Sequence, residues 1–242
     1  MLCLYLQAPF GVSRTFTAGS FRPTAEFVSY SAFYGLLLNV AGIEMRHDDG
    51  RSVMTLIKPD LPKFRLALGA LSFPLQHSIY QQMHSYRVGG QEKVPDPDNP
   101  GSMISVEGLG LRRTKGGKYN ITPTRRAFLS DIRAYIALDA DGEFEPQVLA
   151  GLRGESSRTY GLPFLGDNSF LLDKLANVEQ PEPAYWYVPV LPDTAGGLRE
   201  RVTRLTVTID RADMSRTTSA LFAPTEQPTT EIPAQAWVPV GY

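Results

Sequence analysis

The stretch from Gly89 to Thr124 constrains the fold more than any other part of the sequence. It contains seven glycines and four prolines and has no clear helical period. Loops longer than about 12–15 residues are uncommon in compact domains unless they are functional or disordered. Two short strand-like runs, Met103–Val106 and Lys118–Ile121, flank glycine-rich turns within it. We therefore predict an extended β-hairpin that projects from the body of the protein like a finger.

The rest of the chain predicts short strands and two helices. Apolar or alternating runs predict strands at 2–6, 63–68, 77–88, 128–138, 185–191 and 205–209, with imperfect alternation in 128–138. Helical spacing predicts one helix that begins near Ser29 or Ser31 and ends at Gly42, and another over Phe144–Leu152. This β-α-β-β-α-β order favours an α+β, ferredoxin-like (RRM-like) domain with an inserted β-hairpin and a small β-rich C-terminal part.

The predicted domain boundaries follow from these elements. We place the ferredoxin-like body at residues 1–210, the inserted thumb at 88–124, and a C-terminal extension that packs on the body at 211–242. A length of 242 residues and a hydrophobic content of 43% suit one globular unit with a sizeable insertion. Trp237 and Tyr242 are expected to attach the proline-rich tail to the body. Gly35 costs the first helix about 1 kcal/mol, so we expect a close approach there.

Composition narrows the functional classes. The net charge of −1 means that any nucleic-acid site must come from local clustering of charge. Cys3 is the single cysteine, which excludes an internal disulfide and a cysteine pair for a metal. No apolar run reaches the roughly 18–20 residues that span a bilayer. We expect a cytoplasmic protein without membrane contact.

The strongest local signal is a basic stretch from Gly108 to Arg126, which has six basic residues and no acidic one. Basic side chains neutralise phosphates, and the interleaved Tyr119 can stack on an unpaired base for about 1–3 kcal/mol. The alternative is a solvated hairpin whose charge only aids solubility. The basic residues are Arg112, Arg113, Lys115, Lys118, Arg125 and Arg126.

A second candidate RNA-binding segment precedes the first predicted helix. Arg14 and Arg22 lie in a polar, glycine-containing stretch, followed by Thr24 and by Ser31 at the helix start. Free backbone N–H groups at a helix N-terminus favour phosphate binding. The alternative is an ordinary capped helix with incidental arginines.

Catalytic motifs have less support. Gly110–Lys118 is not a phosphate-binding loop, because its spacing is wrong and Tyr119 stands where a Ser or Thr would hold magnesium. His77 or His84, with a tyrosine and a lysine, could serve metal-free RNA cleavage, although a histidine in a strand more often has a structural role. We predict no catalytic residue, no metal site and no cofactor.

Several segments, taken in their order along the chain, together resemble one protein family. They are Ala8–Phe10, Ser13–Arg14, Arg22–Thr24, Tyr30–Ile43 and Arg125–Leu129. They resemble the Cas-five subunits of type I CRISPR effector complexes (Cascade), in which a strand and an arginine-containing loop lead to a helix and a strand returns after a thumb. The resemblance covers the chain from Met1 to about Leu138.

The resemblance implies a RAMP-type ferredoxin-like body with a thumb, and a subunit that caps the 5′ handle of crRNA. It implies contacts with the backbone RAMP subunits and the large subunit of Cascade, and with target DNA through the complex. By matched position, Arg14, Arg22 and the helix start at Ser31 would face the handle. The basic residues Arg112, Arg113, Lys115 and Lys118 would lie on the thumb, along the RNA backbone.

One branch of this family trims precursor crRNA with a Tyr, a Lys and a His, the last two adjacent in sequence. This chain has no Lys-His pair, which argues against that activity. Our leading prediction is a non-catalytic crRNA-binding subunit. The alternatives are a metal-independent endoribonuclease that processes precursor crRNA, and a protein-only scaffold that docks a partner through the hairpin.

Overall fold

The computed structural model describes residues 1–15, 17, 21–47, 50, 56–85, 91–107, 120–158, 161–190 and 200–241. The chain forms two compact units. The first consists of Met1–Thr17, Pro23–His77 and Ala127–Tyr242, and the second of Ala18–Arg22 and Ser78–Arg126. Two of the four boundaries between the units fall inside strands, so β6 (Leu75–Ser85) and β9 (Asn120–Asp139) contribute residues to each unit.

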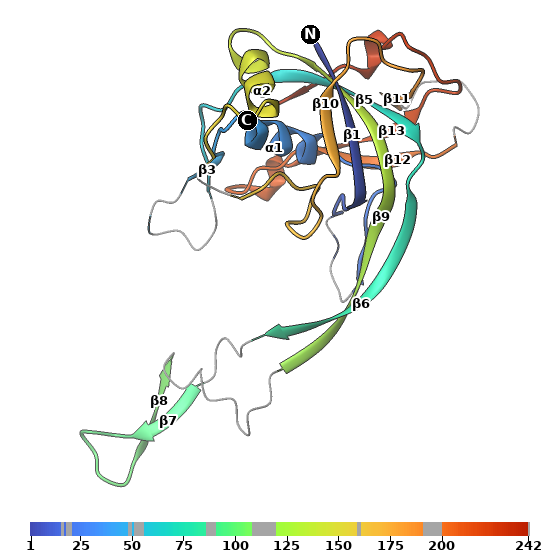
Figure 1. Ribbon diagram of the computed structural model, residues 1–242. Helices are drawn as coiled ribbons and strands as arrows, with labels where there is room; N and C mark the ends of the chain where they lie inside the picture. Colours follow the sequence, from blue (N-terminus) through green and yellow to red (C-terminus); the bar gives the residue numbers. More distant parts are fainter. Residues whose placement is uncertain are drawn as a thin grey trace. The chain divides into compact units, whose positions relative to one another are not determined.

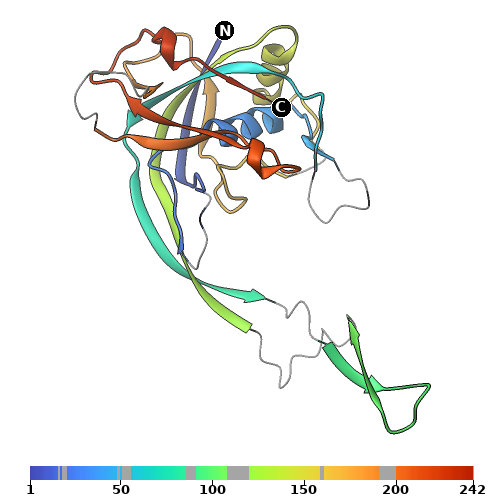
Figure 2. The same cartoon turned by 180° about the vertical axis from the view of Figure 1, so that it is seen from behind.

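The first unit is built on a large antiparallel sheet with two neighbouring helices (Figures 1 and 2). Seven strands follow the order β10-β1-β9-β5-β11-β13-β12, and each neighbouring pair is antiparallel. In that order their bounds are Lys174–Asn177, Leu2–Gly11, Asn120–Asp139, Phe64–Ser72, Tyr185–Pro189, Thr218–Pro224 and Thr203–Thr208. The predicted mixed fold with an antiparallel sheet and two helices is confirmed, and all six predicted strands overlap observed ones.

Five further strands complete the pairing around the first unit's sheet and beside it. β14 (Val238–Val240) pairs with β5, and β2 (Phe21–Arg22) and β6 pair with β9. β3 (Arg46–His47) and β4 (Leu56–Ile57) form a separate two-stranded sheet. The predicted boundary at 210/211 falls in the turn between β12 and β13, two strands that pair with each other.

The sheet of the first unit is buried on both faces. On one face Leu4, Leu6 and Ala8 of β1 alternate into the main core, which both helices share. On the other face a smaller cluster surrounds the fully buried Trp186, whose Nε1 donates a hydrogen bond to the carbonyl of Thr229 at 2.9 Å. Trp237 packs against this second cluster, as predicted for the tail. The predicted anchor Tyr242 lies outside the described residues.

Helix α1 (Tyr30–Val40) is capped as its sequence predicts. Ser29 is the N-cap, and its hydroxyl accepts a hydrogen bond from the backbone N–H of Ala32 at 3.4 Å. The helix ends before Gly42, whose φ of 82° is the left-handed conformation that favours glycine. Helix α2 (Phe144–Leu152) has the predicted bounds.

The expected close approach lies at a different glycine from the one predicted. A Cβ atom added to Gly35 of α1 would lie 3.7 Å from Met45 Sδ, an ordinary van der Waals contact. A Cβ atom added to Gly151 of α2 would lie 1.8 Å from the carbonyl oxygen of Val40. The tight packing between the helices therefore depends on Gly151, and Gly35 meets no comparable constraint.

The second unit includes a hairpin whose arms differ from the predicted ones. β8 (Met103–Glu107) contains the predicted run at 103–106, but it pairs with β7 (Gln91–Pro95), which we did not predict. The register runs from Gln91 opposite Glu107 to Pro95 opposite Met103. The other predicted arm, 118–121, enters β9 at Asn120, and its first two residues lie outside the described ones. Proline and charge in β7 obscured its strand pattern.

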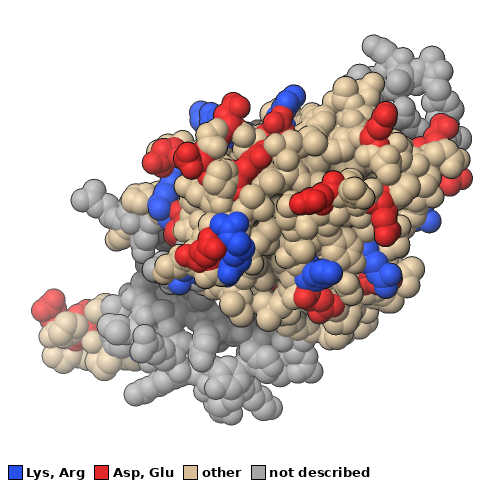
Figure 3. Space-filling model, turned by 45° about the horizontal axis from the view of Figure 1, so that its top comes forward, with Lys and Arg blue, Asp and Glu red and all other residues tan. Residues whose placement is uncertain are grey.

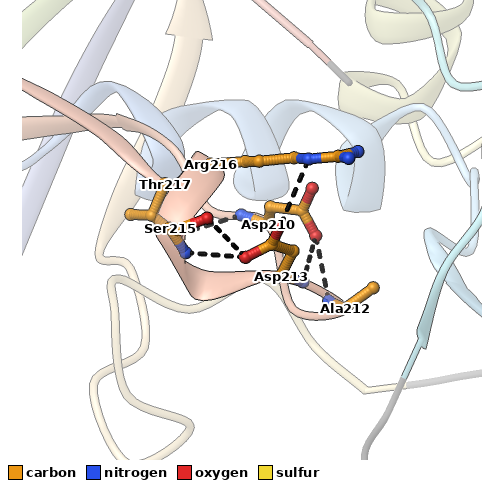
Figure 4. A network of polar contacts seen from close by, with 6 residues as sticks. All are labelled: Asp210, Ala212, Asp213, Ser215, Arg216 and Thr217. Carbon is orange, nitrogen blue, oxygen red and sulfur yellow. Dashed lines mark hydrogen bonds and ion pairs between the residues drawn. The ribbon is translucent and has the colours of Figure 1, made fainter.

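A turn between β12 and β13 is held by local polar contacts (Figure 4). Asp210 accepts hydrogen bonds from the backbone N–H groups of Ala212 and Asp213 at 2.9 Å each. The Asp213 carboxylate caps the short 3₁₀ helix η3 (Met214–Arg216) by accepting from the backbone N–H of Ser215 at 3.0 Å and from its hydroxyl at 2.6 Å. The hydrogen bond from the Ser215 hydroxyl is the main cause that holds the pKa of Asp213 below its ordinary value of 3.8, and the bond from the Ser215 backbone N–H adds to it.

The two glycines give opposite stability predictions. Gly35→Ala should raise the free energy of unfolding by about 1 kcal/mol, because alanine restricts the unfolded chain and fits the space. Gly151→Ala should lower it by about 1–3 kcal/mol, because its methyl group would overlap α1. Urea unfolding followed by circular dichroism measures both changes. Equal effects of the two substitutions would contradict the assigned packing.

The Asp213 turn gives a prediction for pH. Since its folded pKa is lowered, the capping contact stabilises the turn above pH 3.8 and is lost as pH falls through the folded pKa. An NMR titration of the Asp213 carboxyl group should give a midpoint below 3.8, and Ser215→Ala should move it back toward that value. An unchanged midpoint in the variant would contradict the role of the hydroxyl.

Candidate nucleic-acid interface

The predicted RNA-binding residues fall into three groups. Arg14, Thr24 and Ser31 belong to the first unit. Arg22, Arg125 and Arg126 belong to the second. The thumb residues Arg112, Arg113, Lys115, Lys118 and Tyr119 lie outside the described residues.

Arg14 lies at the surface of the first unit, paired with a buried carboxylate. Its Nη2 donates to Asp167 Oδ2 at 2.7 Å, and the side chains are 52% and 8% exposed, respectively. The other Asp167 carboxylate oxygen accepts from the backbone N–H of Ser169 at 3.1 Å. A guanidinium group has five N–H donors, so this ion pair orients Arg14 and still leaves a surface on which it can meet a phosphate.

Thr24 supports the backbone beside Arg14. Its side-chain oxygen accepts a hydrogen bond from the backbone N–H of Ser13 at 2.9 Å, and both residues are buried. Arg14 and Thr24 also form an antiparallel β-bridge. The Thr24 hydroxyl thus faces the protein rather than solvent, and its role in this geometry is to position Arg14.

The segment Phe164–Leu171, which we name the Asp167 loop, packs tightly on the chain just before Arg14. The backbone N–H of Val12 donates to the carbonyl of Leu165 at 3.2 Å. Gly166 has a φ of 78°, and a Cβ atom there would lie 1.8 Å from the carbonyl oxygen of Val12. Only glycine fits this position, so the loop holds Asp167 at a fixed place under Arg14.

An aromatic cluster that the sequence did not predict lies on the same unit. Phe10 of β1 and Phe128 of β9 meet edge to face with ring centroids 5.5 Å apart, and Phe170 of the Asp167 loop lies 6.0 and 6.1 Å from them. His77 of β6 stacks on Phe128 at 5.5 Å, and its Nε2 lies 2.8 Å from Ser130 Oγ. Phe10 is 43% exposed and His77 is exposed. We name these four rings the aromatic cluster.

At the predicted helix start, Ser31 contacts the residue that caps the helix. Ser29 caps α1 and is buried, and Tyr30 at the first helical position is fully buried. Ser31 is half-buried, and its Oγ lies 3.1 Å from Ser29 Oγ. The backbone N–H groups of Ala32 and Phe33 donate to the carbonyl oxygen of Ser29 at 3.1 and 3.2 Å.

The second unit gathers arginines around an exposed ring. β2 and β9 pair in parallel, with Phe21 opposite Arg125 and Arg22 opposite Arg126. The Arg125 guanidinium lies 5.2 Å from the centroid of Phe21, which is 42% exposed, and its Nε donates to Ser78 Oγ at 3.1 Å. We name Arg22, Arg125 and Arg126 the arginine cluster.

Neighbouring strands fix the arginine cluster and add aromatic surface. Arg126 Nη1 donates to Gln81 Oε1 of β6 at 2.7 Å. Tyr80 and Ile79 of β6 are exposed. Neither β6 nor residues 120–126 of β9 contain an acidic residue. Positive charge beside exposed rings is the combination that single-stranded nucleic acid requires.

The charge of the β7–β8 hairpin has the opposite sign. Residues 91–107 contain four acidic residues and one lysine, Lys93. On the face of the molecule in Figure 3, acidic and basic side chains are interspersed without a dominant basic patch. The arginine cluster therefore differs in charge from the β7–β8 hairpin of the same unit.

Metal-binding clusters and membrane-spanning helices are both absent from the described residues. Within the described ranges, no three His, Cys, Asp or Glu side chains gather where they could hold a metal ion. No helix in the described part of the chain has the length and apolarity needed to cross a membrane. The side chain of His84 lies outside the described residues, so the structure describes one of the two candidate catalytic histidines, His77 in the aromatic cluster.

Comparison with solved structures identifies a shared fold. One similar chain comes from a structure described as "CRISPR RNA-guided surveillance complex", with a TM-score of 0.52, 16% identity, and coverage of 95% of this chain and 91% of that chain. A second, described as "Crystal structure of Cas protein", has a TM-score of 0.44 and 16% identity over 96% and 97% of the two chains. The first comparison establishes the fold. No protein-family model and no curated protein sequence match the chain.

The Arg14–Asp167 pair yields a stability prediction. Asp167→Ala should lower the free energy of unfolding by about 1–3 kcal/mol, because a buried acceptor of two hydrogen bonds is lost. Arg14→Ala should cost less than about 1 kcal/mol, because Arg14 is half-exposed and water screens its charge. Urea unfolding of both variants measures the difference. A larger cost for Arg14→Ala would show that the arginine, and not the loop, holds this site together.

Proposed function

We propose that this protein is a non-catalytic RNA-binding subunit of a type I CRISPR complex, in which it binds the 5′ handle of crRNA. The shared fold carries this proposal, because the similar chain belongs to a structure described as an RNA-guided surveillance complex and the likeness spans 95% of this chain. The order of segments that resembles the Cas-five family, from Ala8–Phe10 to Arg125–Leu129, supports the same conclusion independently of the fold.

The strand order supports a ferredoxin-like, RAMP-type interpretation. Four strands lie side by side as β10-β1-β9-β5. Helix α1 lies between β1 and β5 in the sequence, and α2 between β9 and β10. Numbered along the chain, these strands give the order 4-1-3-2 of a β-α-β-β-α-β unit. The remaining strands and the hairpin are additions to this unit.

The chemistry of both clusters suits unpaired RNA. RNA-binding sheets of this type stack bases on aromatic side chains, and arginines bind the phosphates between them. In the first unit Arg14 lies beside the loop that carries Phe170 of the aromatic cluster. In the second unit Arg125 of the arginine cluster lies over the ring of Phe21. We therefore propose that Arg14, the aromatic cluster and the arginine cluster contact the RNA.

The partners follow from the proposed complex. We expect contacts with the backbone RAMP subunits, with the large subunit, and with target DNA through the complex. The basic residues Arg112, Arg113, Lys115 and Lys118 remain our prediction for contacts along the RNA on the thumb. The acidic β7–β8 hairpin suits a protein surface better than a phosphate backbone, because like charges repel.

We propose that the protein lacks ribonuclease activity. His77 stacks on Phe128 and lies within hydrogen-bond distance of Ser130, which accounts for it as a member of the aromatic cluster. The adjacent Lys-His pair of the processing branch is missing. A separate subunit would then process precursor crRNA.

RNA binding should depend on salt through the arginine cluster. Each phosphate contact on a single strand contributes about 0.7 to the slope of log K against log salt concentration. The double variant Arg125→Ala/Arg126→Ala should therefore reduce that slope by about 1.4 and weaken binding. Fluorescence anisotropy with labelled CRISPR repeat RNA at several salt concentrations measures it. Arg153→Ala is the matched control, because Arg153 is an exposed arginine paired with Glu155 outside the proposed interface.

The same assay tests the alternatives. Cleavage of the repeat RNA by the wild-type protein in EDTA, abolished by His77→Ala, would replace the proposal with the endoribonuclease function. RNA affinity that is independent of salt, or equal losses in Arg153→Ala and the double variant, would rule out the proposed interface.

A further inference from the structure

A pocket of the first unit shares no residue with the aromatic cluster of that unit. It has a volume of about 190 Å³, and buried Leu129 and Tyr187 form its floor with Phe73 at its side. Its rim is polar and exposed, with Glu26, Gln76 and Arg201. An apolar floor with a few polar groups around it is the usual construction of a ligand site.

Strand alternation separates the pocket from the aromatic cluster. Gln76 and His77 are consecutive on β6, and Leu129 lies between Phe128 and Ser130 on β9. Successive side chains of a strand point to opposite faces. Gln76 and Leu129 thus line the pocket on one face, and His77 and Phe128 belong to the aromatic cluster on the other.

Arg201 is held over the pocket in an unusual backbone conformation. Its φ of 56° is in the left-handed region, which costs a non-glycine residue free energy and is found most often at functional sites. Its guanidinium lies 4.2 Å from the centroid of Phe73. Stacking on Phe73 keeps the planar group in place, and Arg201 remains exposed to solvent. A planar guanidinium is a surface on which RNA-binding proteins stack bases.

Glu26 gives the pocket a carboxylate acceptor on an anchored stretch of backbone. Its backbone N–H donates to Thr203 Oγ1 of β12 at 3.1 Å, which anchors the residue. Burial raises the pKa of Tyr187; the nearby Glu26 carboxylate also raises it, whereas Arg201 lowers it. Both charged groups therefore act on the same side chain at the pocket floor, and a bound molecule would meet an acceptor and a cation together.

We infer that this pocket binds a single unpaired nucleobase that carries an amino group, stacked on Arg201 with its amino edge donating to Glu26. Its volume is below the roughly 300–1,000 Å³ of sites for larger organic ligands, so it suits one ring system. Adenine and cytosine have an exocyclic amino donor that uracil lacks. The inference rests on the proposed function, since it takes the base to belong to a bound single strand.

Binding of RNA homopolymers by the full chain tests the preference for a base with an amino group. Labelled octamers of adenosine, cytidine and uridine are compared by fluorescence anisotropy. We expect the wild type to bind the adenosine or cytidine octamer at least about tenfold more tightly than the uridine octamer. Glu26→Gln should reduce this ratio to about threefold or less. Arg201→Gly should weaken binding of the preferred octamer about 5- to 100-fold, in line with the loss of one stacked base.

Two controls distinguish a loss of the pocket contact from a folding defect as the cause of weaker binding. Glycine adopts a positive φ without strain, so Arg201→Gly should unfold at the wild-type temperature. Arg216→Ala removes an exposed arginine of the β12–β13 turn that is paired with Asp213, and it should bind all three octamers like the wild type. Wild-type binding by both pocket variants would overturn the inference.

A direct probe distinguishes failure of the pocket from failure of the proposed function. The methyl groups of Leu129 at the pocket floor are observed by NMR while AMP, CMP or UMP is added. Shifts with AMP or CMP but no binding of any octamer would sustain the pocket and reject the RNA-binding function. Octamer binding without shifts at Leu129 would reject the pocket alone, and its occupant would then be sought among protein partners.

Discussion

The antiparallel pairing of β1 with β9 is the interaction on which the rest of the structure depends. The register runs from Leu2 opposite Leu138 to Gly11 opposite Leu129, and β9 also pairs with β5 on its other side. This places one buried strand pair at the centre of the sheet with apolar clusters on both faces. The aromatic cluster depends on the same pairing, which brings the end of β1 beside the middle of β9.

A change in the side-chain alternation of β1 and β9 takes two aromatic residues off the core face of the sheet. Ile132 is buried in the core, and the next core residue toward the start of β9 is Leu129, three positions away instead of two. Asp131 between them has a φ of 53°, and β1 shows the same change between Ala8 and Gly11. Such irregularities re-aim side chains. Phe10 and Phe128 consequently leave the core face, which explains the imperfect alternation in the sequence of β9.

The sequence revealed the basic residues of the candidate site more readily than the contacts that these residues make. Arg125 and Arg126 stood out because basic residues cluster locally within an almost neutral chain, and Arg14 because it precedes a recognisable helix. The role of Thr24 was not predictable, because only its burial and its contact with Ser13 assign it a positioning role. Asp167 and Phe170 were missed because they are separated from Arg14 and Phe10 by more than 150 residues, and neither belongs to a periodic pattern.

The sequence by itself determined the two helices and the central strands, since apolar spacing and the Ser29 cap are local properties that the chain carries into any environment. It also determined where positive charge is concentrated. Only the tertiary structure decided which strands are neighbours, which glycine is packed against a backbone, and which rings meet. The physical reason is that register, close approach and the pocket under Arg201 arise from contacts between distant segments, and no local pattern encodes them.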